Sequence, residues 1–410
     1  MTNLQINELA RLATGRTREL FSDDFQRCHS VLEQEIRDRR ILVIGGAGSI
    51  GGATIRKMVP FGPRALHVVD QNENGLAELV RDLRSSNDPA DLKDLRTLPL
   101  NFGGPVMERF LREEAPYDHV LNFAALKHVR SEKDCFSILQ MLDTNVVRPA
   151  HLLRWLAARG GVRRYFCVST DKAANPVNLM GASKRLMEHV IFSEATTAGD
   201  AGIKVTSSRF ANVAFSDGSL LQGWLMRLAK GQPLAVPRDT RRYFVSLPEA
   251  GQICLLAAFA TPDRHLLVPR LDPSNDLIDL AGLATQVLRQ SGYTPQVFET
   301  EEEARAAMTN GKANGSYPLL LTPLDTSGEK PYEEFVGEGE RSVDLGLTQL
   351  SGVAYLPAHA EVLAGFMRRV EEMIDTPGKP ASKEQLVEEI QRVLPEFHHI
   401  ASAKTLDQRL

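Results

Sequence analysis

The stretch Ile41-Leu42-Val43-Ile44-Gly45-Gly46-Ala47-Gly48-Ser49-Ile50-Gly51 decides the fold of this chain. Its first four residues form a continuous apolar run, which is typical of a parallel strand buried on both faces. Three glycines follow: Gly45 permits a tight turn, Gly48 lets the backbone approach a pyrophosphate, and Gly51 allows close helix–strand packing. A helix that begins near Ser49 points free N–H groups and the positive end of its dipole at phosphates. The order strand, glycine turn, helix predicts a dinucleotide site, although a glycine-rich turn that merely packs tightly is the alternative.

A carboxylate at the end of the next strand favours one of the two nicotinamide cofactors. Asp70 closes the apolar segment 65–70 and is placed to accept hydrogen bonds from the adenosine ribose hydroxyls. Its charge repels a 2′-phosphate, and no arginine follows it immediately, so we expect NAD rather than NADP. Asn101 stands at the adenine edge, where an aspartate is usual, and Phe102 is able to pack on the ring. For these last two residues, ordinary loop positions are an equal alternative.

The rest of the first half alternates between strand-like and helix-like segments. Further strands are expected at 117–123, 165–170 and 204–209, separated by stretches of helix length. This alternation predicts an α/β fold with a doubly wound parallel sheet, followed by a smaller C-terminal lobe.

Changes in this rhythm suggest where the units begin and end. We expect helices over 1–40, a dinucleotide-binding domain over 41–212 to which 240–272 returns, and a mainly substrate-binding lobe over 213–355. A helical tail over 356–410 contains a capping-box sequence that begins at residue 382.

Composition limits the classes of function. The chain has 410 residues and a formal net charge of −4, with basic residues scattered, so nucleic acid is not an expected partner. Four cysteines lie far apart and the histidines are dispersed, which suggests neither a disulfide framework nor a metal site. The first residues lack the apolar core of a signal peptide, and no apolar run reaches the roughly 20 residues of a membrane span. We therefore expect a soluble, cytoplasmic protein.

Candidate acid–base residues follow the strand at 165–168. Thr170, Asp171 and Lys172 offer a hydroxyl, a carboxylate and an ammonium at the carboxyl end of a strand, where reaction centres of doubly wound sheets gather. The alternative is an aspartate that caps a loop beside a solvated lysine. Met180 and Lys184 share one face of the next helix, in the positions of the Tyr-Lys pair of ordinary short-chain dehydrogenases. A thioether cannot exchange a proton, so the acid–base chemistry is either lost or relocated.

Six segments carry a resemblance to a known family: VIGGAGSIGGA, NFAALKHV, STDKAANPVNLMGASKRLMEHV, SSRFANVAFSDGSLL, DTRRYFVSLPEA and SGEKPYEEF. They span residues 41 to about 336 and resemble the CapD-like polysaccharide-biosynthesis branch of nucleotide-sugar 4,6-dehydratases, which are extended short-chain dehydrogenases (Rossmann folds). In that branch a methionine regularly stands at the tyrosine position, so Met180 fits. The chain departs from the pattern at Ile44, at 126–130 and through roughly 296–316, which looks like an insertion.

The resemblance implies an NAD-dependent reaction on UDP-N-acetylglucosamine or a close UDP-sugar that gives a 4-keto-6-deoxy sugar. Thr170 would bond the C4 oxygen, Asp171 would protonate the departing C6 hydroxyl, and Lys172 would remove the C5 proton. Asp171, or a water near Thr170, would accept the C4 hydroxyl proton. Lys184 would hold the nicotinamide ribose. The resemblance also implies a homo-oligomer.

The remaining contacts implied by the resemblance are these. The cofactor residues are Gly45, Gly48, Ser49, Ile50, Gly51, Asp70, Asn101, Phe102, Ala124, Ala125, Lys127, Asn145 and Lys184. The substrate residues are Met180, Asn212, Ser219, Arg242 and Glu329. Outside the catalytic segment, a surface ion pair or a loop cap is an equal alternative for each, and Lys127 and His128 shape the cofactor pocket rather than react.

Two other functions stay open. A nucleotide-sugar C4-epimerase would use the same scaffold and return the hydride to C4, but epimerases keep the tyrosine and do not need the adjacent Asp171-Lys172 pair. A non-catalytic NAD-binding protein is the second alternative, motivated by the missing tyrosine.

Overall fold

The strand before the glycine loop lies in the middle of a large sheet. A computed structural model describes residues 3–85, 92–128, 132, 134–197, 202–311, 315–323, 332–376 and 382–399. In it β1 (Arg40–Ile44) pairs in parallel with β2 (Ala65–Val69) on one side and β4 (His119–Asn122) on the other. Its four apolar residues are almost completely buried, as a continuous apolar pattern predicts for a strand covered on both faces.

Nine of the described strands form this main sheet, in the order β14-β15-β10-β6-β5-β4-β1-β2-β3. The strands not yet bounded are β3 (Asp94–Leu98), β5 (Arg164–Val168), β6 (Lys204–Ser208), β10 (His265–Pro269), β14 (Ser342–Val343) and β15 (Leu350–Ala354). Those from β10 to β3 run parallel, while β15 and β14 join antiparallel at one edge.

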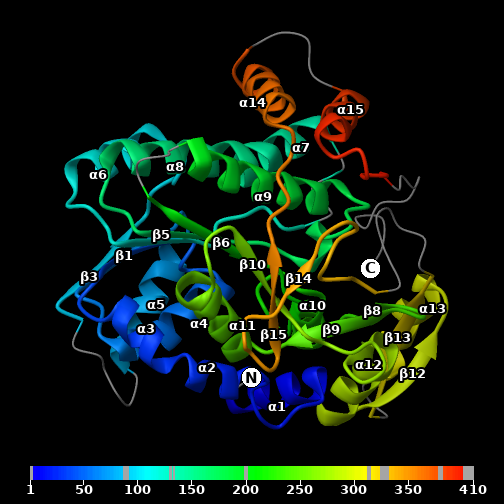
Figure 1. The fold of residues 1–410 in the computed structure, drawn as a ribbon. Helices are drawn as coiled ribbons and strands as arrows, with labels where there is room; N and C mark the ends of the chain where they lie inside the picture. Colours follow the sequence, from blue (N-terminus) through cyan, green and yellow to red (C-terminus); the bar gives the residue numbers. More distant parts are fainter. Residues whose placement is uncertain are drawn as a thin grey trace.

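Helices cover both faces of the main sheet (Figure 1). One layer consists of α6 (Pro105–Glu113), α8 (Arg148–Arg159) and α9 (Leu179–Thr197), with α7 (Cys135–Leu142) and the π-helical turn η3 (Asp143–Val147) leading into α8. The opposite layer consists of α4 (Ser49–Met58), α5 (Glu73–Ser85) and α11 (Leu247–Leu255), extended by the short turns η1 (Val59–Phe61) and η6 (Leu256–Ala260). The expected α/β doubly wound fold is confirmed.

A smaller lobe follows β6 and contains two three-stranded sheets. One has the order β11-β9-β7, formed by β11 (Leu277–Asp279), β9 (Arg241–Val245) and β7 (Asn212–Val213). The other has the order β12-β13-β8, formed by β12 (Thr294–Phe298), β13 (Ser316–Thr322) and β8 (Leu234–Pro237). The lobe's helices are α10 (Leu220–Lys230), α12 (Leu280–Gln290) and α13 (Glu301–Gly311). The segment that looked like an insertion is thus the unit β12-α13-β13.

Two of the expected boundaries differ from the structure. Within 240–272, the strand β9 belongs to the lobe, where it pairs with β7 and β11, and the return to the main sheet is made by α11, η6 and β10. Conversely β14 and β15, expected in the lobe, extend the main sheet, because β15 pairs antiparallel with β10. Antiparallel strands read as short apolar segments, which sequence periodicity does not assign to one sheet or another.

The two ends of the chain pack on different cores. At the N-terminus, α1 (Asn3–Thr14) buries Leu9 in the core of the smaller lobe, whereas α2 (Ser22–Arg27) and α3 (His29–Ile36) lie beside the main core, where Leu32 is buried. At the other end, α14 (Ala360–Asp375) and α15 (Lys383–Val393) pack on α7, η3 and α9 (Figure 1). Met180 lies in this second apolar cluster, so the tail supports a helix that borders the site.

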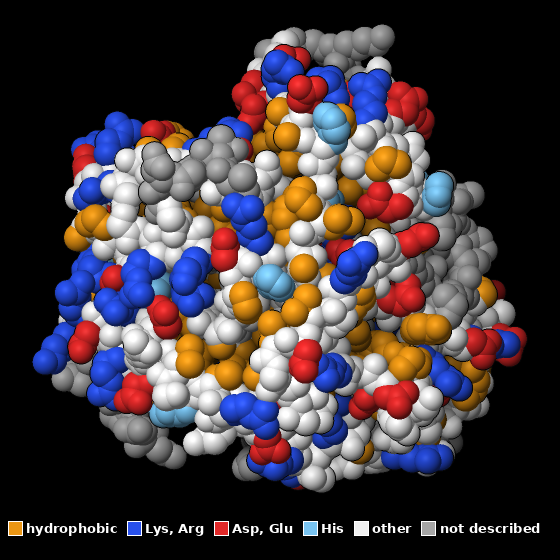
Figure 2. All heavy atoms as spheres, in the orientation of Figure 1, with side chains coloured by type: hydrophobic (Ala, Val, Ile, Leu, Met, Phe, Trp, Pro, Cys, Tyr) orange, Lys and Arg blue, Asp and Glu red, His pale blue; other side chains and the backbone are white. Residues whose placement is uncertain are grey.

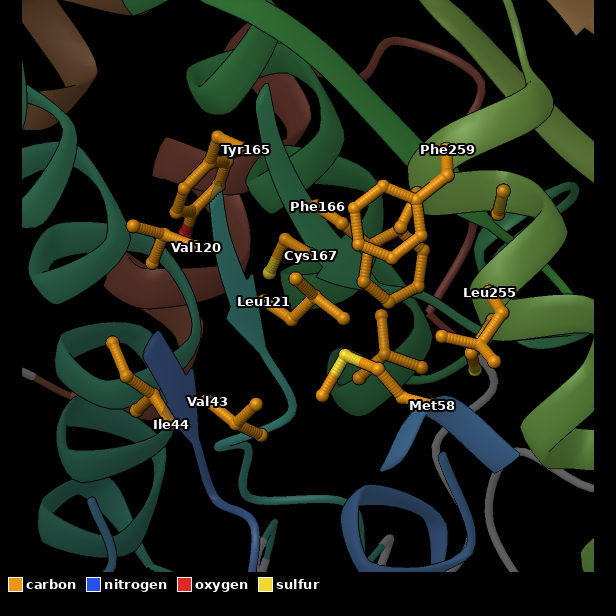
Figure 3. Packing of buried hydrophobic residues seen from close by; sticks show 14 of the residues in the cluster. Val43, Ile44, Met58, Val120, Leu121, Tyr165, Phe166, Cys167, Leu255 and Phe259 are labelled. Atoms are coloured by element: carbon orange, nitrogen blue, oxygen red, sulfur yellow. The ribbon is translucent and has the colours of Figure 1, made fainter. Parts of the chain in front are cut away.

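Side chains alternate across the central strands. Val43, Leu121 and Phe166 share one face of β1, β4 and β5, because they are register partners. Figure 3 shows them directed toward Met58 of α4 and Phe259 of η6. Successive residues of these strands point to the other helix layer, so the strand interiors are apolar, whereas polar residues such as Arg40, Asn122 and Arg164 lie at the strand ends.

The surface carries mixed charge. Basic and acidic side chains lie next to one another over much of the face in Figure 2. No helix among the described residues is both long and apolar enough to cross a lipid bilayer.

Candidate nucleotide and catalytic site

A cavity of about 1080 Å³ opens at the carboxyl ends of the parallel strands. Its wall contains most of the residues expected from the sequence, namely Gly45, Gly48, Ser49, Ile50, Gly51, Asp70, Asn101, Phe102, Ala124, Ala125, Lys127, Thr170, Lys172, Met180, Lys184, Asn212, Ser219 and Arg242. Asp171 and Asn145 lie behind the wall, and Glu329 lies outside the described residues. The volume is slightly above the range of about 300 to 1,000 Å³ that is usual for small-molecule sites.

The glycine loop is built so that side chains are excluded at its turn. Gly45 has a φ of +74°, and a Cβ there would lie 2.5 Å from the Ala124 nitrogen. A Cβ on Gly51 would lie 2.4 Å from the Gly45 oxygen, whereas one on Gly48 would lie 3.4 Å from it. Gly45 and Gly51 are therefore required by the fold itself. Gly48 is not, so we expect it to be needed for the close approach of a ligand. Gly46, which sequence reasoning missed, packs on β2, where its Cβ would lie 2.4 Å from Val68 Cγ1.

Gly51→Ala is expected to weaken dinucleotide binding by about tenfold or more, because the added methyl would push the turn away from α4. Isothermal titration with NAD measures the effect. Gly223→Ala on α10 is the matched control, since a Cβ there meets nothing within 4 Å. Equal NAD affinities for the two variants would contradict this role of Gly51.

Asp70 is fixed at the end of β2 by two backbone groups. Its Oδ2 accepts a hydrogen bond from Ala47 N at 3.0 Å, and its Oδ1 accepts one from Asn72 N at 3.0 Å. The carboxylate is thus held against the glycine loop, where its remaining lone pairs border the cavity.

Asn145 acts on the wall of the cavity without forming part of it. Its Oδ1 accepts from Leu126 N at 2.8 Å, and its Nδ2 donates to Leu126 O at 2.8 Å and to Ser183 Oγ at 2.9 Å. This buried amide therefore clamps the loop after β4, next to Ala124 and Ala125. Asn145 thus steadies the end of the neighbouring strand, as the sequence suggested, and its contact with a cofactor stays a prediction.

Asp217, in the loop before α10, links two of the expected cofactor residues. Its Oδ2 accepts from Ser49 Oγ at 2.6 Å, its N–H donates to Ser49 Oγ at 2.8 Å, and its carbonyl accepts from Lys127 Nζ at 2.6 Å. We call this the Asp217 bridge. Sequence reasoning missed it because Ser49 and Asp217 are 168 positions apart.

The candidate acid–base segment Thr170–Lys172 lies at the short turn η4 (Asp171–Ala173), two residues after β5. Thr170 Oγ1 donates to Asp171 Oδ1 at 2.8 Å, and Lys172 Nζ lies 3.1 Å from the same oxygen. The Asp171 side chain is only 2% exposed, and its Oδ2 has no hydrogen-bond partner among the described residues. Asp171 therefore borders the cavity through Thr170 and Lys172, and its direct role toward a substrate stays a prediction.

Glu333 is a second carboxylate beside Lys172. Its Oε1 lies 3.8 Å from Lys172 Nζ, and its side chain is 5% exposed. Burial lowers the pKa of Lys172, but the charges of Asp171 and Glu333 outweigh this effect, so the pKa lies above its ordinary value. Lys172 is thus an ammonium in this state. Glu333 belongs to the segment SGEKPYEEF, which gave the only sequence signal for it.

Lys184 is a buried cation that faces the cavity. Its Nζ lies 3.3 Å from Met187 Sδ, and burial lowers its pKa below the ordinary value. An ammonium held by a thioether keeps donors for a ligand in the cavity. Gly181 brings this helix close to the catalytic turn, because a Cβ there would lie 2.4 Å from Lys172 O.

Met180 is the second residue of α9 and lies in the same wall. Its side chain is 4% exposed, and its N–H donates to Glu132 Oε1 at 3.0 Å. Glu132 Oε2 in turn lies 3.5 Å from His399 Nε2 of the tail. The tail thus holds the first turn of the helix that carries Met180 and Lys184.

The far wall comes from the smaller lobe. Asn212 Nδ2 donates to Tyr243 O at 3.3 Å, and Ser219 is the N-cap of α10, where its Oγ accepts from Gln222 N. Arg242, on β9, carries a charge that acts on Lys172. A helix N-terminus and a guanidinium at one wall suit a phosphate group.

Comparison with known proteins assigns the family. The family model described as "Polysaccharide biosynthesis protein" matches residues 41–350. The chain belongs to this polysaccharide biosynthesis protein family. A protein of Methanocaldococcus jannaschii named as an uncharacterized membrane protein is 31% identical over 306 residues, which are 74% of this chain and 82% of that protein.

Other members of the polysaccharide biosynthesis protein family are longer. The probable polysaccharide biosynthesis protein EpsC of Bacillus subtilis and the capsular polysaccharide biosynthesis protein CapD of Staphylococcus aureus are each 26% identical. The matches cover 76% and 82% of this chain but 47% and 51% of those proteins. The chain thus spans about half the length of these two relatives. A UDP-glucose 4-epimerase of Rickettsia massiliae is 24% identical over 75% of this chain and 89% of its own.

Solved structures share the fold. Pen from Bacillus thuringiensis superposes with a TM-score of 0.61 at 20% identity, over 80% of this chain and 90% of that one. WbmF of Bordetella bronchiseptica, solved in complex with NAD+ and UDP, gives 0.50 at 18% identity, over 67% of this chain and 88% of that one. At these identities the likeness concerns the fold alone.

Proposed function

We propose that this chain is an NAD-dependent nucleotide-sugar 4,6-dehydratase that acts on UDP-N-acetylglucosamine or a close UDP-sugar. The observation that carries the proposal is that Thr170 and Lys172 line the same cavity as Met180, Lys184 and the glycine loop. The cavity carries groups that can act as acid and base. Met180 places an apolar thioether where short-chain dehydrogenases usually have the phenol of a tyrosine. Family membership supports a role in polysaccharide synthesis.

The cavity fits a nicotinamide dinucleotide. The turn at Gly45 and Gly51 leaves backbone N–H groups of α4 free for a pyrophosphate, Asp70 accepts from ribose hydroxyls, and Lys184 donates to the second ribose. When bound, the nicotinamide ring supplies reversible hydride transfer. The NAD+ and UDP held by the structural relative WbmF agree with this reading.

The chain's own residues then move protons. Thr170 hydrogen-bonds the C4 hydroxyl of the sugar and passes its proton to Asp171 Oδ1, the acceptor that Thr170 already faces at 2.8 Å. Protonation of Asp171 removes a charge that raises the pKa of Lys172, so the ammonium releases its proton to solvent more readily. The neutral amine then takes the C5 proton once C4 is a ketone. Asp171 returns its proton to the C6 oxygen through Thr170, and Lys172 returns its proton to C5. No proton is gained or lost over the cycle.

Product mass tests the proposal. Purified protein is incubated with NAD and a panel of UDP- and dTDP-sugars, and mass spectrometry follows the products. The proposal expects one UDP-sugar to lose one water. An isomer of equal mass would instead identify an epimerase, the activity named for the Rickettsia relative. Met180 disfavours that outcome, because a thioether cannot supply the phenol proton that epimerisation uses.

Glu333→Gln is expected to move the acidic limb of the pH–rate profile to lower pH by about one unit. The carboxylate of Glu333 raises the pKa of Lys172, so its loss lets Lys172 become neutral at a lower pH. Steady-state rates from acidic to alkaline pH measure the shift.

Glu334→Gln is the matched control in the same segment. The Glu334 carboxylate accepts from Asn175 Nδ2 at 2.7 Å and lies on the surface. An unchanged acidic limb in Glu333→Gln would show that Lys172 does not work as the base.

A further inference from the structure

At the end of the cavity beyond Asp70, the wall combines an amide, an aromatic ring and a guanidinium. Beyond Asp70, the carboxyl end of β3 contributes Asn101 and Phe102, and the first turn of α8 contributes Arg148. If the proposed dinucleotide lies across the glycine loop, its adenine base reaches this wall, because the base follows the ribose that Asp70 holds.

The side-chain amide of Asn101 has a defined orientation. Its Oδ1 accepts from Gly103 N at 3.1 Å and from Arg148 Nη1 at 2.7 Å. Both neighbours are donors, so the opposite orientation would place the amide NH₂ against two N–H groups. The oxygen is therefore committed to protein groups, and the NH₂ of Asn101 is turned the other way.

Arg148 is held in place to fix this orientation. Its Nη2 lies 2.6 Å from Asp143 Oδ2, and its side chain crosses Gly103, where a Cβ would lie 2.3 Å from Arg148 Cδ. The same Asp143 carboxylate accepts from Gln140 Nε2 at 3.1 Å. The acceptors Asp143 Oδ2 and Asn101 Oδ1 are thus engaged with protein donors, and Asn101 offers a donor to a base.

A donor at this place selects among purines by their 6-substituent. Adenine carries an amino group there, which is itself a donor, whereas a 6-oxopurine carries an acceptor oxygen. An asparagine with both amide groups available reads adenine through its amino group and N7, but Asn101 lacks a free oxygen for that amino group. An aspartate would accept from it.

We propose that Asn101, positioned by Arg148, makes the base pocket accept a nicotinamide dinucleotide with a 6-oxopurine at least as tightly as NAD itself. Adenine still binds, because its ring nitrogens are acceptors for the Asn101 NH₂ and its faces pack on the apolar wall. The inference rests on the proposed dinucleotide site and concerns only which base that site recognises.

The test compares two ligands on the full-length protein. NAD and nicotinamide hypoxanthine dinucleotide are each titrated by calorimetry, and the ratio of their dissociation constants is the readout. Wild type is expected to bind the hypoxanthine dinucleotide as tightly as NAD or more tightly. Asn101→Asp is expected to shift the ratio about tenfold toward NAD, the effect of one hydrogen bond to a charged group.

Asn72→Asp is the matched control. It adds the same charge near Asp70, where the Asn72 side chain accepts from Gly75 N, so any change in affinity applies to both ligands and the ratio stays constant. Circular dichroism establishes that both variants are folded.

The outcomes separate this inference from the proposed function. Binding of NAD by wild type with a preference of about tenfold or more over the hypoxanthine dinucleotide would overturn the inference alone. An unchanged ratio in Asn101→Asp would do the same. Failure of wild type to bind either ligand would overturn the proposed dinucleotide site and the inference with it.

Discussion

Asp171→Asn and Lys172→Ala are each expected to reduce turnover by about 10² to 10⁴, the usual contribution of one positioned acid or base. The amide introduced by Asp171→Asn would take no proton from Thr170, and the methyl side chain left by Lys172→Ala would give the C5 proton no acceptor. Rates of keto-sugar formation measure the loss. NAD titration should give near wild-type affinity, because neither side chain belongs to the glycine loop or the ribose contacts.

A lysine at the other edge of the sheet provides the control. Lys204 begins β6 at the amino end of the strands and is exposed, so Lys204→Ala should keep full turnover. Near-normal rates in both Asp171→Asn and Lys172→Ala would remove the basis of the assignment.

Arg209→Met is expected to cost about 3 to 5 kcal/mol in the free energy of unfolding, which is the usual effect of removing one partner from a buried ion pair. Arg209 is completely buried after β6 and donates to Glu188 at 2.6 Å and to Glu340 at 2.6 Å. Without it, both carboxylates stay buried with less compensation. Urea denaturation followed by circular dichroism measures the loss.

The pH dependence has a defined sign. Burial alone would raise the pKa of Glu340, but its bonds and charge interactions with Arg209 and Arg185 lower it to about 2, below the ordinary 4.5. The pair therefore stabilises the fold fully above pH 4.5, and this contribution declines as pH falls toward 2. Arg209→Met should lose less stability than wild type over that acid range.

An exposed pair gives the matched comparison. Arg81 and Glu78 form an ion pair on α5 with side chains that are 74% and 72% exposed, so Arg81→Ala should change the free energy of unfolding by under about 1 kcal/mol. Equal losses in Arg81→Ala and Arg209→Met would contradict a stabilising role for the buried network.

Local patterns predicted the parts of the molecule that local geometry determines. The strand–glycine–helix segment and Asp70 were predictable because Gly45 and Gly51 have no room for a side chain beside their neighbours in the turn. The segment Thr170–Lys172 follows β5, as the sequence predicted, but the burial of Asp171 depends on how α9 packs through Gly181, which no spacing records.

Contacts between distant segments were out of reach of the sequence. Glu333 meets Lys172, and Arg209 joins Glu188 to Glu340, only because the segment after the smaller lobe returns to the main sheet. The antiparallel strands β14 and β15 were missed for the same reason. Charged residues that look like ordinary surface residues in the sequence become partners in buried ion pairs once the sheet is assembled.

The Asp217 bridge has a consequence for how the protein is supplied with its nucleotide. Hydrogen bonds from Ser49 and Lys127 to Asp217 tie the glycine loop to the loop after β4. If the proposed nucleotide binds beneath this bridge, its departure requires that these bonds open together. The proposed dehydration returns the nicotinamide to the oxidation state in which it started, so the nucleotide need not leave between turnovers. One nucleotide, acquired once, would then serve many sugar molecules, and the protein would remain active in surroundings where the free nucleotide is scarce.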